Sequence, residues 1–236
     1  MPVVDLSLPV TAGMAVYPGD PEVRIAPALT VGADGVAVAR LDLGTHTGTH
    51  LDAPAHSIAG ARTVERIPLE LLVGAARVLR VGPEPAAAGE SITRERLADA
   101  IPDRLPSIVC IATGWDAHFG TAVALCHPSI SLDLARLLWE RGARVLGVDC
   151  FSPDPTAGGV ESGGADAGEA DAVGADAGAD PMPVHRFWLG GDGVIVENLT
   201  RLTELPGSVE MSLLPLRLDG SDGSPIRAVA RFDHAD

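Results

Sequence analysis

The sequence contains no lysine, and its 17 basic residues, all arginine, are outnumbered by 32 acidic residues, for a formal net charge of −15. This charge argues against nucleic acid and anionic membrane surfaces as partners. No apolar run is long enough to span a bilayer, and the first residues lack the basic and apolar regions of a signal peptide. The three cysteines have no C-x-x-C spacing, which favours reduced thiols in the cytoplasm over a disulfide framework.

Aromatic residues are also scarce, at 3% of 236 residues, although 46% of the chain is hydrophobic. An aliphatic core and a single domain are therefore expected. A helix is predicted over residues 132–141, with Ser131 as its N-cap and Gly142 after its last turn. Many strands beside few helices predict an α/β or mixed α+β fold with a mostly mixed β-sheet core. The predicted strands span residues 36–43 (half-buried), 75–81, 108–113, 145–148, 194–196, 209–218 and 226–232.

One segment, residues 157–180, has a composition of its own. It is almost wholly alanine, glycine, aspartate and glutamate, with six acidic residues and no arginine. It loosely resembles a calcium-binding loop but lacks the spacing of an EF-hand. Its composition predicts a mobile, solvated loop inserted within the domain.

Three of the seven histidines lie in one short stretch, together with an aspartate: His46, His50, Asp52 and His56. Imidazole and carboxylate are ligands of divalent ions such as zinc and manganese. Glycine and proline in the stretch argue against a helix and favour a tight loop that folds around an ion. His56 exceeds the three ligands of a minimal site and is available to move protons. The alternative is that these histidines make ordinary hydrogen bonds.

The pattern H-x-G-T-H-x-D-x-P-x-H resembles the signature of the metal-dependent cyclase hydrolase family, which includes bacterial kynurenine formamidases and isatin hydrolase. The resemblance covers nearly the whole chain, because other segments are similar to the family in the same order. It implies one domain over residues 1–236, a swivelling β/β/α-like fold and a homodimer or higher oligomer. The similar segments include Asp5-Leu6-Ser7, Tyr17-Pro18-Gly19-Asp20, Ile67-Pro68-Leu69-Glu70, Thr113-Gly114-Trp115-Asp116 and Ser152-Pro153-Asp154-Pro155.

The resemblance also implies roles for seven residues. His46, His50 and Asp52 match ligands of a first metal, and Asp52 takes the position that bridges to a second. His56 matches the catalytic histidine that transfers protons. The family pairs a histidine with a glutamate twelve residues later, as His185 and Glu197 are spaced here. His185 would bind the second metal and Glu197 would bridge both. Tyr17, where formamidases have tryptophan, would contact substrate.

These roles imply a hydrolase that holds one or two zinc or manganese ions and attacks the carbonyl of a small molecule with activated water. The expected reaction is cleavage of an aryl formamide or amide, with N-formylkynurenine as the best single substrate. The alternatives are hydrolysis of a lactam such as isatin, a cyclase of secondary metabolism, and a metal-binding protein without catalysis. The presence of His56 argues against the last of these, because metal storage does not need a proton-transfer group.

Overall fold

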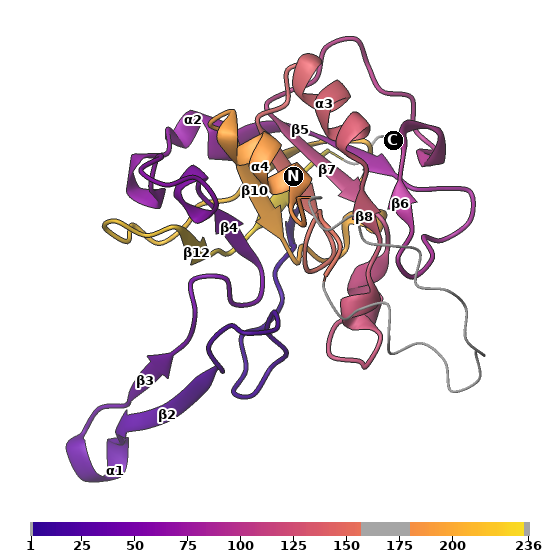
Figure 1. Cartoon of the computed structure of the whole chain (residues 1–236). Coiled ribbons are helices and arrows are strands. Elements are labelled where there is room, and N and C mark those ends of the chain that lie inside the picture. The colour runs from indigo at the N-terminus through magenta and orange to yellow at the C-terminus, as the bar shows by residue number, and fades with distance from the viewer. Residues whose placement is uncertain (1, 157–179, 234–236) are drawn as a thin grey trace.

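The structure, a computed structural model, describes residues 2–156 and 180–233 (Figure 1). The predicted acidic loop, residues 157–180, lies outside this part of the chain except for Asp180. A nine-stranded mixed sheet forms the centre of the molecule. In spatial order its strands are β1 (Val3–Asp5), β13 (Val229–Arg231), β11 (Ser208–Ser212), β5 (Val73–Arg80), β7 (Ile108–Ala112), β9 (Val145–Val148), β10 (Val194–Glu197), β4 (His50–Asp52) and β12 (Gly223–Pro225).

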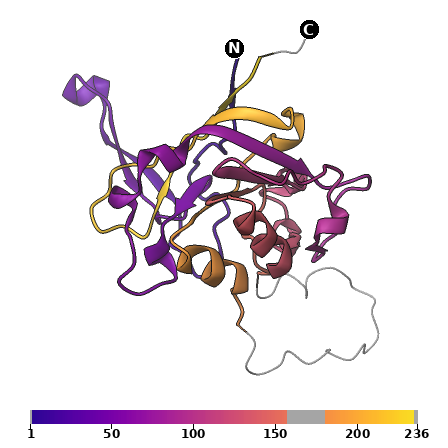
Figure 2. The same cartoon turned by 90° about the horizontal axis from the view of Figure 1, so that it is seen from above.

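The four central strands β5, β7, β9 and β10 are parallel, whereas the strands on both sides of them pair antiparallel. Parallel strands are usually buried on both faces, and the short apolar runs of β7 and β9 are fully buried here. One face packs against α3 (Leu132–Glu140) and α4 (Pro183–Gly190), which lie together on the same side of the sheet (Figure 2). The other face packs inside the curl of the sheet.

The predicted aliphatic core and the mixed α+β fold are confirmed. The described residues contain four α-helices, of which α1 (Val31–Asp34) and α2 (Leu69–Leu72) are single turns. The predicted helix is α3, whose N-cap Ser131 accepts a hydrogen bond from the Leu134 amide at 3.2 Å. None of the described helices is long and apolar enough to cross a membrane.

The strand predicted over residues 36–43 is present, but it is exposed rather than half-buried. This segment forms β3 (Val38–Asp42), whose residues are all exposed, as are those of its only partner strand, β2 (Arg24–Leu29). The two strands and α1 form an arm, residues 24–42, that projects from the body in both views (Figures 1 and 2). The alternation correctly indicates a strand, but no part of the described chain covers its apolar side.

The prediction for the last strands was correct in position and too long in extent. The segment 209–218 is a strand only to Ser212, and the segment 226–232 contains β13 at its centre. Between them lies β12, which pairs with β4 at the edge of the sheet. A short parallel pair, β6 (Ser91–Ile92) and β8 (Ser129–Ile130), lies apart from the main sheet.

Candidate metal centre

The second half of the histidine stretch is a strand of the sheet rather than a loop. In β4, Leu51 is fully buried in the core on one face, so that His50 and Asp52 both point to the opposite face, the side of α4. Strand β10 pairs antiparallel with β4 and sets Glu197 directly opposite His50. The pairing of the two strands therefore brings Glu197 next to His50 and Asp52, although Glu197 is at least 145 residues from both in the sequence.

His185 reaches the same place from the first turn of α4. The Asp154 carboxylate accepts hydrogen bonds from the Val184 and His185 amides, both at 2.9 Å, and from His185 Nδ1 at 2.8 Å. A carboxylate at this position also interacts favourably with the helix dipole. Because Asp154 takes Nδ1, the Nε2 atom of His185 faces the carboxylates of the sheet.

The two carboxylates lie between two imidazoles. His50 Nε2 is 3.3 Å from Asp52 Oδ1 and 3.2 Å from Glu197 Oε2. The other oxygen of each carboxylate faces His185 Nε2, with Asp52 Oδ2 at 3.7 Å and Glu197 Oε1 at 3.3 Å. The side chains of all four residues are at most 8% exposed. Each carboxylate thus extends from one imidazole to the other, as a bridging ligand would.

His46 lies on the loop before β4, and its Nδ1 is 2.6 Å from Asp52 Oδ1. The loop turns at Gly48, whose φ of 63° is in the left-handed region that favours glycine. The Gly48 carbonyl accepts a hydrogen bond from His50 Nδ1 at 2.8 Å, which directs His50 Nε2 toward the carboxylates. The predicted loop is therefore confirmed for the first half of the motif.

Charge in this cluster is balanced between imidazoles and carboxylates. Burial opposes the charged forms, but the carboxylates of Asp52 and Glu197 outweigh it and raise the pKa of His50 to about 10. Burial likewise lowers the pKa of His185, but the carboxylates of Asp154, Asp52 and Glu197 outweigh it and raise this pKa well above its ordinary value. Although burial raises the pKa of Asp52, its imidazole neighbours lower it more, to well below the usual range. Asp52 therefore stays ionised at neutral pH, as a metal ligand must.

Two atoms indicate that this cluster fits a divalent cation. Asp52 Oδ2 and Glu197 Oε1 are buried and accept no hydrogen bond, although His185 Nε2 lies 3.7 and 3.3 Å from them. A buried carboxylate oxygen without a donor is unfavourable, and a cation between the carboxylates and the imidazoles would satisfy both atoms. One donor atom each from His50, Asp52 and Glu197 lie within 4.8 Å of one another. The nitrogen and oxygen donors suit zinc and manganese.

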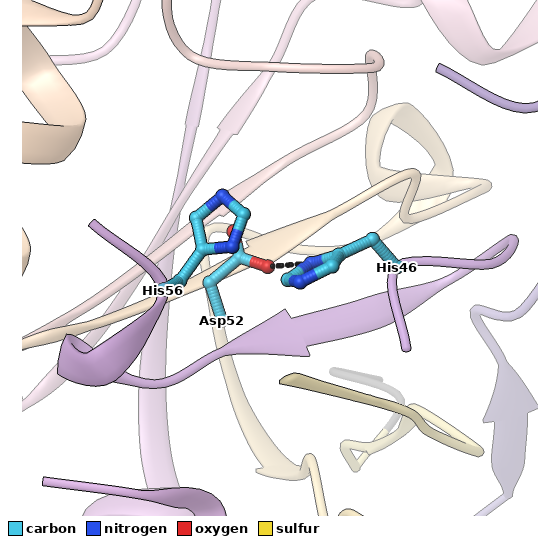
Figure 3. A group of neighbouring side chains, drawn as sticks. All are labelled: His46, Asp52 and His56. Atoms are coloured by element: carbon cyan, nitrogen blue, oxygen red, sulfur yellow. Dashed lines mark hydrogen bonds and ion pairs between the residues drawn. The ribbon is translucent and has the colours of Figure 1, made fainter. Parts of the chain in front are cut away.

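A second candidate group shares Asp52 with the first. Donor atoms of His46, Asp52 and His56 also lie within 4.8 Å of one another, and Figure 3 shows both imidazoles beside the Asp52 carboxylate, with the interaction of His46 drawn as a dashed line. His56 ends a single 3₁₀ turn, η1 (Pro54–His56), and its ring centroid is 4.1 Å from that of His46 and 5.7 Å from that of His185. Its side chain is 25% exposed, so it is more accessible than the other histidines of the cluster.

A cavity of about 400 Å³ opens over the histidines. His46, His50, His56, His185 and Glu197 line its floor. Tyr17 lies in its wall with Phe151 and Met182, which give the wall an aromatic and apolar character. The structure thus brings all seven predicted site residues into one place: six in the cluster and Tyr17 beside it. Their individual roles remain predictions.

Three further residues of the site were not assigned from the sequence. Asp154 orients His185, and Asn198 donates from Nδ2 to the Gly48 carbonyl at 3.2 Å and lines the cavity. Asp222, from the loop before β12, lies beside His46 and His56. The only indication of Asp154 in the sequence is that it lies in a segment that resembles the family. Asp222 lies in a predicted turn, and nothing else in the sequence points to it.

The comparisons with known proteins agree with this geometry. Residues 4–155 match the family model named Cyclase. The chain belongs to the cyclase family. This member of the family is 30% identical to the kynurenine formamidase of Salinibacter ruber (strain DSM 13855 / M31), over 98% of each chain. It is 32% identical to the kynurenine formamidase of Paracidovorax citrulli (strain AAC00-1), over 96% of this chain and 95% of that one.

Solved structures share the fold over almost the whole chain. A structure described as a potential metal-dependent hydrolase with cyclase activity is 26% identical, with a TM-score of 0.70 over 98% of this chain and 99% of that one. Isatin hydrolase A from Labrenzia aggregata is 22% identical, with a TM-score of 0.76 over 97% and 93% of the two chains. At that identity the second likeness is one of fold alone. The predicted family is therefore confirmed.

Replacing Asp154 by asparagine should destabilise the protein and displace His185. An amide offers one acceptor where the carboxylate accepts three N–H bonds, and a buried donor left unsatisfied costs about 1–3 kcal/mol. We expect urea denaturation to give a free energy of unfolding lower by about that amount. The matched control is Asp133→Asn, in the first turn of α3, where the carboxylate is 94% exposed. Equal stability of the two variants would contradict the role of Asp154.

Proposed function

We propose that this chain is a metal-dependent hydrolase that cleaves the C–N bond of a small aryl formamide or amide, with N-formylkynurenine as its best single substrate. The observation that carries the proposal is the pair of buried carboxylate oxygens, Asp52 Oδ2 and Glu197 Oε1, that face the His185 imidazole but accept no hydrogen bond. The names of the two kynurenine formamidases, at 30% and 32% identity, support the choice of substrate.

We assign the metal ligands as follows. His46 and His50 bind a first ion, and His185 binds a second. Asp52 and Glu197 bridge the two, each offering one oxygen to each ion. The contacts of both carboxylates with His50 and His185 support two ions per chain, of zinc or manganese. When bound, a divalent cation lowers the pKa of water and polarises a carbonyl oxygen.

His56 is the proposed proton-transfer residue. Its ring lines the cavity beside the ligands and is partly exposed, so that it can reach both water and substrate. Hydrolysis of a formamide requires removal of a proton from the attacking water and delivery of a proton to the departing nitrogen, because an amine leaves poorly unless protonated. A single imidazole in this position can perform both transfers.

The cavity wall supports an aromatic substrate. Tyr17 and Phe151 give it two rings, and Met182 adds a flexible apolar side chain at the beginning of α4. Such surfaces bind planar apolar groups, whereas the polar floor faces the bond to be cleaved. We assign Tyr17 to substrate binding on this basis.

The first test is hydrolysis of N-formylkynurenine by metal-loaded wild type and by His56→Ala. We expect wild type to produce kynurenine and formate, and the variant to retain its metal while its kcat falls by about 10²–10⁴-fold, the usual contribution of general acid–base catalysis. Metal content is measured on the same samples by elemental analysis.

The matched control is His118→Ala, because His118 packs against Trp115 and does not line the cavity. A His56→Ala protein with wild-type kcat would contradict the proton-transfer role, and one that loses metal would make His56 a ligand. Wild type that opens isatin but leaves N-formylkynurenine intact would replace the formamide by a lactam.

We also propose that the protein is a homodimer or larger homo-oligomer in the cytoplasm. The arm, residues 24–42, supports assembly, because an isolated two-stranded hairpin is marginally stable in water and this one exposes Leu41 and Val31 to 62% and 68%. The arm begins after Asp20 of the cavity wall and ends before His46, so a partner that orders it would also order the site. The three cysteines, an odd number without C-x-x-C spacing, support a reducing compartment.

Sedimentation velocity tests the assembly. Leu41→Asp, on the arm, should convert wild-type dimers to monomers, because a buried charge in an apolar interface is unfavourable. Leu69→Asp, at an equally exposed leucine on the body (62%), is the control and should leave the dimer intact. A monomeric wild type, or a Leu41→Asp protein as dimeric as the control, would contradict the proposal.

A further inference from the structure

Asp222 directly precedes β12, the edge strand that pairs with β4 on the side away from β10. Gly223 pairs with Asp52 across β12 and β4, and the Asp222 carbonyl accepts a hydrogen bond from the Ala53 amide at 2.8 Å. These backbone bonds hold Asp222 over the strand that carries His50 and Asp52. The Asp222 side chain takes no part in these bonds, so replacing it should leave the strand pairing intact.

The Asp222 carboxylate contacts three side chains of the motif region. Oδ2 is 3.0 Å from His46 Nε2 and 3.4 Å from His56 Nδ1, and Oδ1 accepts a hydrogen bond from Thr45 Oγ at 3.1 Å. One carboxylate oxygen thus faces both the proposed ligand His46 and the proposed proton-transfer residue His56. The side chain is 44% exposed, so its position is not a consequence of core packing.

The neighbouring residue, Gly223, makes room for the His46 ring in its observed position. A Cβ atom at Gly223 would be 2.5 Å from His46 Cε1, so only glycine permits the observed ring position. Gly223 and Asp222 together determine where the ring lies and which nitrogen it presents. With Asp52 at Nδ1 and Asp222 at Nε2, each nitrogen of His46 has its own carboxylate.

We propose that Asp222 is a positioning residue that orients both His46 and His56. This inference rests on the proposed metal-dependent hydrolase function. A carboxylate that accepts the far N–H of a metal-binding imidazole keeps the ring in the ligating orientation and tautomer. The same oxygen holds the Nδ1–H of His56, which leaves Nε2 as the nitrogen that exchanges protons in the cavity. A single residue thereby links metal binding to proton transfer.

The experiment compares Asp222→Asn with Asp219→Asn. Asp219 lies three residues earlier in the same loop and is exposed. Zinc affinity is measured by competition with a chromophoric chelator, and kcat and KM are measured with zinc at saturation. We expect Asp222→Asn to bind zinc about 10–100-fold more weakly, the usual effect of losing such a partner. We also expect its kcat to fall about tenfold or more at unchanged KM, because His56 lies in the wrong orientation for proton transfer.

The two readouts test the two contacts separately. Wild-type zinc affinity in Asp222→Asn would overturn the action on His46, and a wild-type kcat at saturating zinc would overturn the action on His56. Asp222→Glu, which keeps the charge, should recover part of both values, and Gly223→Ala takes the place of Asp222→Asn if that variant does not fold. Gly223→Ala should weaken zinc binding although Asp222 is intact. If wild type hydrolyses no formamide, amide or lactam, the proposed function fails, whereas the zinc affinities still decide the contact with His46.

Discussion

The site depends on two buried carboxylates, Asp52 and Glu197, that lie among imidazoles in the interior of the protein. Burial of two like charges is strongly unfavourable unless opposite charges and hydrogen bonds surround them. Here His46, His50 and His185 supply part of that compensation, yet one oxygen of each carboxylate accepts no hydrogen bond. A divalent cation at this place would complete the compensation, and the surrounding structure positions the groups that would share it.

Each part of the fold contributes to that arrangement. Pairing of β4 with β10 places Glu197 opposite His50, and α4 brings His185 to the same face of the sheet. Glu197 ends a parallel strand, the location where sheets of this kind usually hold their ligands. On the side of β4 away from β10, the edge strand β12 pairs with it and holds the preceding residue, Asp222, beside the motif. The core beneath, with Leu51 fully buried, makes the register of β4 obligatory, since a shift by one residue would turn its ligands into the core.

Features that depend on residues close together in the chain could be predicted from the sequence, whereas features that depend on contacts between distant segments could not. The four motif residues are close together in the chain and were evident from residue types alone. His185 and Glu197 were reached only through family resemblance, because their separation of twelve residues crosses a helix, a turn and a strand. Asp222 was not predicted, since the pairing of β12 with β4 is a contact over 170 residues that no local pattern encodes. For the same reason, alternation in residues 36–43 indicated a strand but not that it would project from the body.

The most direct test of the account is the number of divalent ions per chain, measured on protein purified without added metal, for wild type, Glu197→Ala and the exposed control Glu210→Ala. The account predicts about two ions in wild type and in the control. One ion would be bound by His46 and His50 and the other by His185, and both would be bridged by the two carboxylates. The account predicts clearly fewer in Glu197→Ala. A wild-type chain that binds no ion, or an ion content unaffected by Glu197→Ala, would contradict it.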